Sequence, residues 1–94
     1  MNLRNTFHLV EHVEKLLFNL DRTAERFTIS HATCELHVIA QSERDQSYSV
    51  HSFFWDRDAE TVGGSLCWGH YDLTHSEAVE VLRKKSVFLE RAVA

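Results

Sequence analysis

The spacing of hydrophobic residues changes along this chain, and that change constrains the fold more than any other feature. Between about residues 6 and 21, apolar side chains recur at steps of three and four, the period of an amphipathic helix. This stripe consists of Phe7, Val10, Val13, Leu16, Leu17 and Leu20. From residue 27 to residue 41 the spacing becomes two, which is typical of a strand. We therefore expect a helix followed by a sheet.

The remainder of the chain predicts two more strands and a second helix. Alternating segments occur in "YSVHSFFW", residues 48–55, and in "SLCWGHYDL", residues 65–73. Thr74 and Glu77 have the spacing of a capping box, so a helix should begin there and continue to the C-terminus. We predict one α+β domain over residues 1–94, with a helix, a three-stranded antiparallel sheet and a C-terminal helix. The sheet has more than three strands if part of residues 27–33 pairs separately.

Composition and charge exclude several classes of function. The 94 residues carry a formal net charge of -4, without the basic excess that a phosphate backbone attracts, so we expect no direct nucleic acid partner. The sequence has no run of about 18 apolar residues, so we expect no membrane span and a cytoplasmic location. It has no glycine-rich phosphate loop before a helix, and we predict no cofactor.

The segment "HLVEH", His8 to His12, matches the H-x-x-E-H pattern of one class of zinc peptidases. In that pattern two histidines one helical turn apart bind zinc and the glutamate activates water. Here the helical period places His8, Glu11 and His12 opposite the apolar stripe. We therefore interpret these side chains as a solvated helix face and predict no metal site.

A second segment, "GHYDLTHSEA", contains the side chains of a conceivable catalytic group. His70, Asp72, His75 and Ser76 lie around a predicted helix N-terminus, whose free N–H groups can bind an anion. The capping box of the same helix already explains this composition. We predict no catalytic residue and no enzymatic activity.

The strands suggest a binding surface. Their alternation assigns aromatic and histidine side chains to the side opposite the predicted core. These residues are His37, His51, Phe53, Trp55, Trp68 and His70. A large aromatic patch left exposed marks a binding surface, so we predict that these residues contact a partner.

Whether this aromatic face is exposed depends on which side of the sheet each helix covers. If both helices cover one face of the sheet, the aromatic face is exposed; if one helix covers each face, these aromatics belong to the core and the histidines lie at its margins. A metal site of His37, His51 and His70 is a third hypothesis, which requires a register that aligns them. A small-molecule pocket is a fourth.

The basic cluster Arg83, Lys84 and Lys85 forms either a solvated helix face paired with Glu80 or a contact for an acidic partner. We add Arg83 and Lys84 to the predicted partner-binding residues.

The predicted function is a small non-catalytic protein-binding module of the adaptor, immunity or inhibitor type, like many proteins of phages and mobile elements. Its partner is another protein, with homodimerisation expected through a strand edge or the aromatic face. The alternative is a metal- or small-ligand-dependent enzyme or sensor that uses the sheet histidines.

Overall fold

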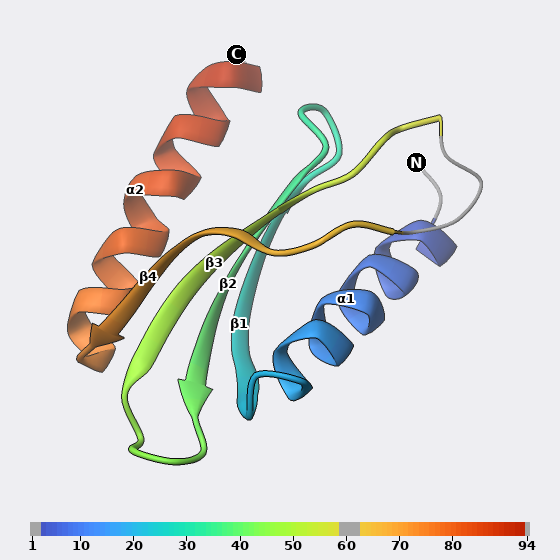
Figure 1. Cartoon of the computed structure of the whole chain (residues 1–94). Coiled ribbons are helices and arrows are strands. Elements are labelled where there is room, and N and C mark those ends of the chain that lie inside the picture. The colour runs from blue at the N-terminus through green and yellow to red at the C-terminus, as the bar shows by residue number, and fades with distance from the viewer. Residues whose placement is uncertain (1–2, 59–62, 94) are drawn as a thin grey trace.

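The computed structural model describes the backbone of residues 3–58 and 63–93, and the side chains of residues 6–58 and 63–85. Two helices enclose a run of four strands in chain order (Figure 1). The elements are α1 (Leu3–Phe18), β1 (Arg22–Ser30), β2 (Glu35–Ser42), β3 (Tyr48–Phe54), β4 (Cys67–Leu73) and α2 (His75–Val93). The predicted α+β class is confirmed.

The sheet has four strands in the order β1-β2-β3-β4, and every neighbouring pair is antiparallel. The prediction of three strands is wrong, because residues 27–41 belong to two strands and not to one. The alternative in which part of residues 27–33 pairs separately is confirmed. A turn at residues 31–34 reverses the chain, and its last residue, Cys34, has a φ of 57°. The left-handed conformation needed for this tight reversal has no glycine or proline signal in the sequence.

Helix α1 packs against one face of the sheet. Its buried side chains are Leu9, Val13 and Leu17, which are spaced by four and lie on one side of the helix. They form one core with Leu36, Val38, Ala40 and Phe53 of the sheet. The predicted stripe included Val13 and Leu17 but wrongly placed Phe7 in the core, where Leu9 lies instead; Phe7 is 64% exposed.

Helix α2 packs against the opposite face. Ala78 and Leu82 contact Ile39 of β2 and Val50 of β3 in a second core. Since Ile39 alternates with Val38 and Ala40, the two helices lie on opposite sides of the sheet, as Figure 1 also shows. The alternative with one helix on each face therefore holds for the helices, but its expectation that the aromatic side chains belong to the core is wrong for Trp68, which is 71% exposed.

The predicted capping box begins α2. The Thr74 N–H donates to Glu77 Oε1 at 2.9 Å, and the Glu77 N–H donates to Thr74 Oγ1 at 3.2 Å. The two bonds satisfy free donors at the helix start and fix where β4 ends and α2 begins. They also favour the structural interpretation of "GHYDLTHSEA".

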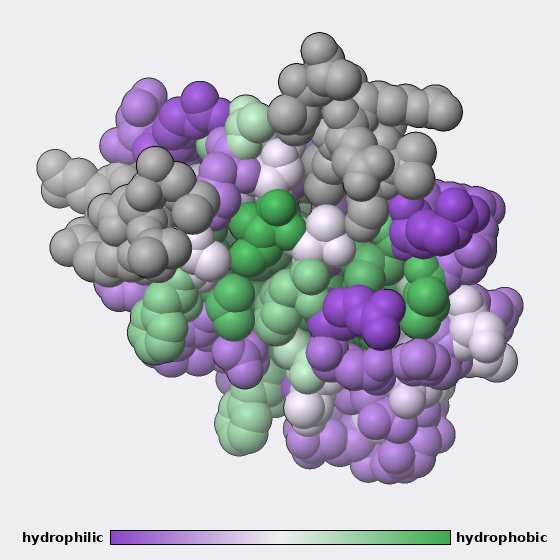
Figure 2. Space-filling model, turned by 180° about the vertical axis from the view of Figure 1, so that it is seen from behind, coloured by the Kyte–Doolittle hydropathy of each residue, from purple (hydrophilic) through white to green (hydrophobic). Residues whose placement is uncertain are grey.

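Several large apolar side chains remain at the surface outside both cores. Phe18 and Leu20, near the end of α1, are 76% and 49% exposed. Figure 2 shows the molecule from behind, where hydrophobic residues occupy a central area bordered by polar residues. Exposed apolar residues alone are common in proteins, so a functional site needs further evidence from geometry.

Candidate functional site

A cavity of about 480 Å³ lies between α2 and the sheet. It is lined by Glu35, His37, Phe54, Trp68, Lys84 and Lys85. The first two come from β2, Phe54 ends β3, Trp68 belongs to β4, and the lysines belong to α2. Four elements that are far apart in the sequence thus meet at one site.

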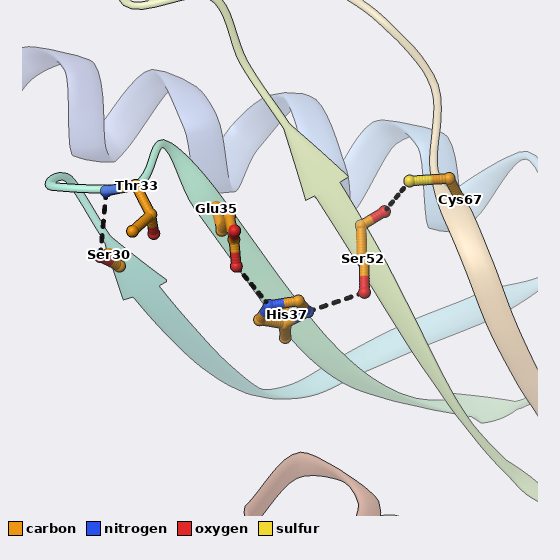
Figure 3. A network of polar contacts seen from close by, with 6 residues as sticks. All are labelled: Ser30, Thr33, Glu35, His37, Ser52 and Cys67. Atoms are coloured by element: carbon orange, nitrogen blue, oxygen red, sulfur yellow. Dashed lines mark hydrogen bonds and ion pairs between the residues drawn. The ribbon is translucent and has the colours of Figure 1, made fainter. Parts of the chain in front are cut away.

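His37 provides a buried polar group at this cavity. Its ring is hydrogen-bonded at both nitrogens, from Nδ1 to Ser52 Oγ at 2.7 Å and from Nε2 to Glu35 Oε2 at 3.3 Å (Figure 3). Burial lowers the pKa of His37, the hydrogen bond to Glu35 opposes this shift, and the charge of Lys85 adds to it. A neutral ring meets both partners when Nε2–H donates to Glu35 and the Ser52 hydroxyl donates to Nδ1.

The series Glu35, His37 and Ser52 has the same residue types as a hydrolase triad. A nucleophile must reach its substrate, however, and Ser52 is fully buried. Figure 3 shows that the contacts continue away from His37, where the Cys67 thiol donates to the Ser52 carbonyl oxygen at 3.4 Å. The geometry therefore gives Ser52 and Glu35 the role of holding the imidazole in one orientation.

Two aromatic rings form a second wall of the cavity. Trp68 and Phe54 meet in a T-shaped arrangement, with ring centroids 5.3 Å apart. The edge of Phe54 also approaches His37, with centroids 6.3 Å apart. Trp68 remains 71% exposed, so most of its ring is free to contact another molecule.

Trp68 is held in an unfavourable backbone conformation. Its φ is 53°, a left-handed value that bulky side chains rarely adopt. The cause is a β-bulge in β4. Ser52 pairs with Cys67 and Val50 pairs with His70, so an advance of three residues along β4 is matched by two residues along β3. Strain of about 1–3 kcal/mol is retained at functional sites more often than elsewhere.

The third wall is cationic. Lys84 and Lys85 line the cavity, and neither forms an ion pair with any residue whose side chain the structure describes. Arg83, one residue earlier, instead pairs with Glu80 at 2.6 Å on the helix surface. The predicted basic cluster is thus divided between a surface ion pair and the cavity.

The structure separates the residues that the sequence placed on one aromatic face. His37 pairs with Ser52 and the adjacent Val38 pairs with His51, so His37 and His51 point to opposite faces of the sheet. The prediction of a common face is therefore wrong. His37, Trp68 and Lys84 meet at the cavity, whereas His51 and Phe53 are buried on the α1 side.

The two remaining predicted residues lie elsewhere. Trp55 is half-buried against the α1 core, and its ring centroid is 5.5 Å from that of His31. His70 is exposed on β4 and is not among the described residues that line the cavity. Because the side chains of His37 and His51 diverge, the hypothesis of a metal site of His37, His51 and His70 is wrong. Among the side chains of residues 6–58 and 63–85, no cluster of three or more His, Cys, Asp and Glu could hold a metal ion.

His51 belongs to a separate, structural cluster under Tyr71. Its Nε2 is 2.8 Å from Ser49 Oγ, which also accepts a hydrogen bond from Arg22 at 3.0 Å. The Tyr71 ring lies over it, with centroids 5.2 Å apart. Burial and the nearby charge of Arg22, with a smaller effect of His70, lower the pKa of His51 to about 4. The ring is therefore neutral at physiological pH.

The "HLVEH" segment is only partly a solvated helix face. His8 and Glu11 are exposed, as predicted. His12 is half-buried, its Nε2 is 2.9 Å from the Gly64 carbonyl oxygen, and its ring centroid is 5.3 Å from that of Phe53. This histidine connects α1 to the segment before β4, so its role is structural.

Sequence reasoning missed Glu35, Phe54 and Lys85 as members of the site. Lys85 carried a signal, because it interrupts the apolar stripe of the last helix. Phe54 carried none, since its alternation with Val50 and Ser52 assigned it to the core.

No protein family, curated protein or solved structure matches this chain. Neither of the helices, over the residues that the structure describes, has the length and apolar content required to cross a membrane.

Proposed function

We propose that this protein acts without catalysis, by binding another protein through the cavity between α2 and the sheet. The observation that carries the proposal is Trp68, which is exposed in the cavity wall on a strained backbone. A strained and exposed tryptophan costs stability, and contact with a partner is the function that offsets this cost best. Tryptophan is also among the residues most enriched at the energetic centres of protein interfaces.

The edges of the sheet support the cavity over strand pairing as the main contact. The edge strand β1 has a register shift between Ala24 and Arg26, and the other edge strand, β4, has two. Such bulges disrupt the ladder that an added strand would extend. Homodimerisation through a strand edge is accordingly a secondary part of the proposal, and an adaptor, immunity or inhibitor role is its primary form.

We place this function in the cytoplasm. Cys34 and Cys67 are free thiols and both are partly exposed. The reducing conditions of the cytoplasm preserve such thiols.

A second candidate function is the binding of a small ligand. The cavity volume of about 480 Å³ falls within the range typical of ligand pockets, roughly 300–1,000 Å³. Native mass spectrometry of the purified protein separates the two candidates, because a resident small ligand adds a discrete mass that the Trp68→Ala variant loses.

The experiment that tests the main proposal is affinity capture from host lysate with three chains. These are the wild type, Trp68→Ala and Phe18→Ala, all checked for native circular dichroism. Phe18 is a matched control, since it is an equally exposed aromatic residue on α1. We expect the wild type and Phe18→Ala to capture the same protein and Trp68→Ala to lose it. Undiminished capture by Trp68→Ala would contradict the proposal.

A further inference from the structure

We infer that the cavity binds an acidic segment of its partner in which an aspartate or glutamate lies beside an aromatic residue. The carboxylate would bind Lys84 and Lys85, and the aromatic ring would pack on Trp68 and Phe54. This inference rests on the proposed function and names the chemistry of the partner.

The charges at the cavity favour a carboxylate. Among the side chains that the structure describes, two ammonium groups, of Lys84 and Lys85, line it together with one carboxylate, that of Glu35. The Glu35 carboxylate accepts a hydrogen bond from His37, and neither lysine forms an ion pair with a side chain that the structure describes. The chain as a whole has a net charge of -4 and repels acidic partners, so this locally cationic cavity is where an acidic segment can approach.

The aromatic wall favours an aromatic neighbour to that carboxylate. Trp68 and Phe54 already form a T-shaped pair at 5.3 Å, and a third ring can pack on the exposed part of Trp68 in the same way. Aromatic pairs of this kind add to the binding that comes from the area that they bury. A cationic ligand would also stack on tryptophan, but Lys84 and Lys85 would repel it.

Nucleotides also combine negative charge with a ring that can stack on tryptophan. The binding experiment must therefore include a nucleotide as a separate ligand. Among the described side chains, two lysines line the cavity, which are few beside the charged groove that follows a nucleic acid backbone. The acidic chain would further weaken the approach of a polyanion. Peptide is thus the ligand class that the charges favour.

The test is an NMR titration of the ¹⁵N-labelled full chain with acetyl-Glu-Phe-amide. Two control peptides each remove one feature: acetyl-Gln-Phe-amide removes the carboxylate and acetyl-Glu-Ala-amide removes the ring. Uridine monophosphate provides the nucleotide arm. The double variant Lys84→Gln, Lys85→Gln tests the cationic wall, and Lys15→Gln is its control because Lys15 pairs with Glu11 on the surface of α1.

We expect acetyl-Glu-Phe-amide to shift the Trp68 indole and the Lys84 and Lys85 amides, with a Kd on the order of 1 mM. Each control peptide should bind at least about fivefold more weakly, the factor expected from losing one contact of about 1 kcal/mol. The double lysine variant should show the same loss, while Lys15→Gln should bind as the wild type does.

Three results would overturn the inference: equal binding of the glutamine control peptide, no shift at concentrations of about 10 mM, or tighter binding of uridine monophosphate. If these occur while partner capture still depends on Trp68, the protein-binding function stands and only its ligand chemistry is wrong. If capture is independent of Trp68, the proposed function itself fails, and the peptide partner fails with it.

Discussion

The two faces of the sheet differ in what their side chains do. On the α1 face, Leu36, Val38 and Phe53 meet a row of buried leucine and valine from the helix. On the α2 face, a smaller core around Ala78 and Leu82 gives way to a cavity with charged and aromatic walls. The comparison indicates that the α1 face supplies most of the stability and that the α2 face combines a minor structural role with binding.

The largest effect should come from the α1 face. Phe53→Ala removes the largest fully buried side chain among those that the structure describes. The change should lower the free energy of unfolding by about 3–5 kcal/mol, through lost burial and a residual cavity. Urea unfolding followed by circular dichroism measures this change. Phe18→Ala, at a largely exposed position, should stay within about 0.5 kcal/mol of the wild type. A loss below 1 kcal/mol for Phe53→Ala would show that the α1 core is not the main source of stability.

The second largest effect should come from acid, which lowers the free energy of unfolding through protonation of His51 on the α1 face. The pKa of His51 is lowered from 6.5 to about 4 in the folded protein, so the unfolded state binds the proton more readily between these values. The contribution of His51 to stability is therefore fully present above pH 6.5 and is lost as the pH falls through 4. The loss should be on the order of 2 to 3 kcal/mol.

Urea unfolding at pH 7.5 and pH 4.5 measures this acid effect. His37, whose pKa is also lowered by burial, changes stability in the same direction, so the decisive comparison is with His51→Gln. That variant should lose a large part of the pH dependence. An unchanged pH dependence in His51→Gln would assign the acid sensitivity to other groups.

The sequence predicted the helices and the class of fold because their signals are local. The stripe around Val13 and the capping box of Thr74 depend on neighbouring residues alone. The hairpin at residues 31–34 was not predictable in this way, because Cys34 adopts a left-handed conformation without a glycine.

The residues of the site were predicted only in part, because the register between neighbouring strands decides which side chains reach the cavity. His37, Trp68 and Lys84 were identified, but the pairing of Val38 with His51 is a tertiary property that periodicity does not contain. The bulge of β4 that contains Trp68, between the pairs Ser52–Cys67 and Val50–His70, has no sequence signal beyond Gly69.

A smaller effect should distinguish strain from packing at the cavity. Trp68→Gly relieves the positive φ, whereas Trp68→Ala retains it, so the glycine variant should be more stable than the alanine variant by about 1 kcal/mol. Both unfolding free energies can be measured in urea. If alanine is the more stable of the two, the backbone at Trp68 is not strained in solution.

The smallest effect should come from the cationic wall. Lys85→Gln should change the free energy of unfolding by less than about 0.5 kcal/mol, because Lys85 has no ion pair within the described side chains to lose. Burial is the main cause of the low pKa of His37 and Lys85 is a lesser one, so the variant should raise that pKa. A histidine NMR titration measures the shift. An unchanged His37 pKa would place the Lys85 ammonium group away from the ring.

The most direct test of binding at the cavity is the affinity of the captured partner for the wild type and for Trp68→Gly, measured by calorimetry on purified proteins. We expect Trp68→Gly to fold with equal or greater stability than Trp68→Ala and to bind at least about tenfold more weakly than the wild type. A variant that binds with wild-type affinity would show that the cavity on the α2 face is not the binding site.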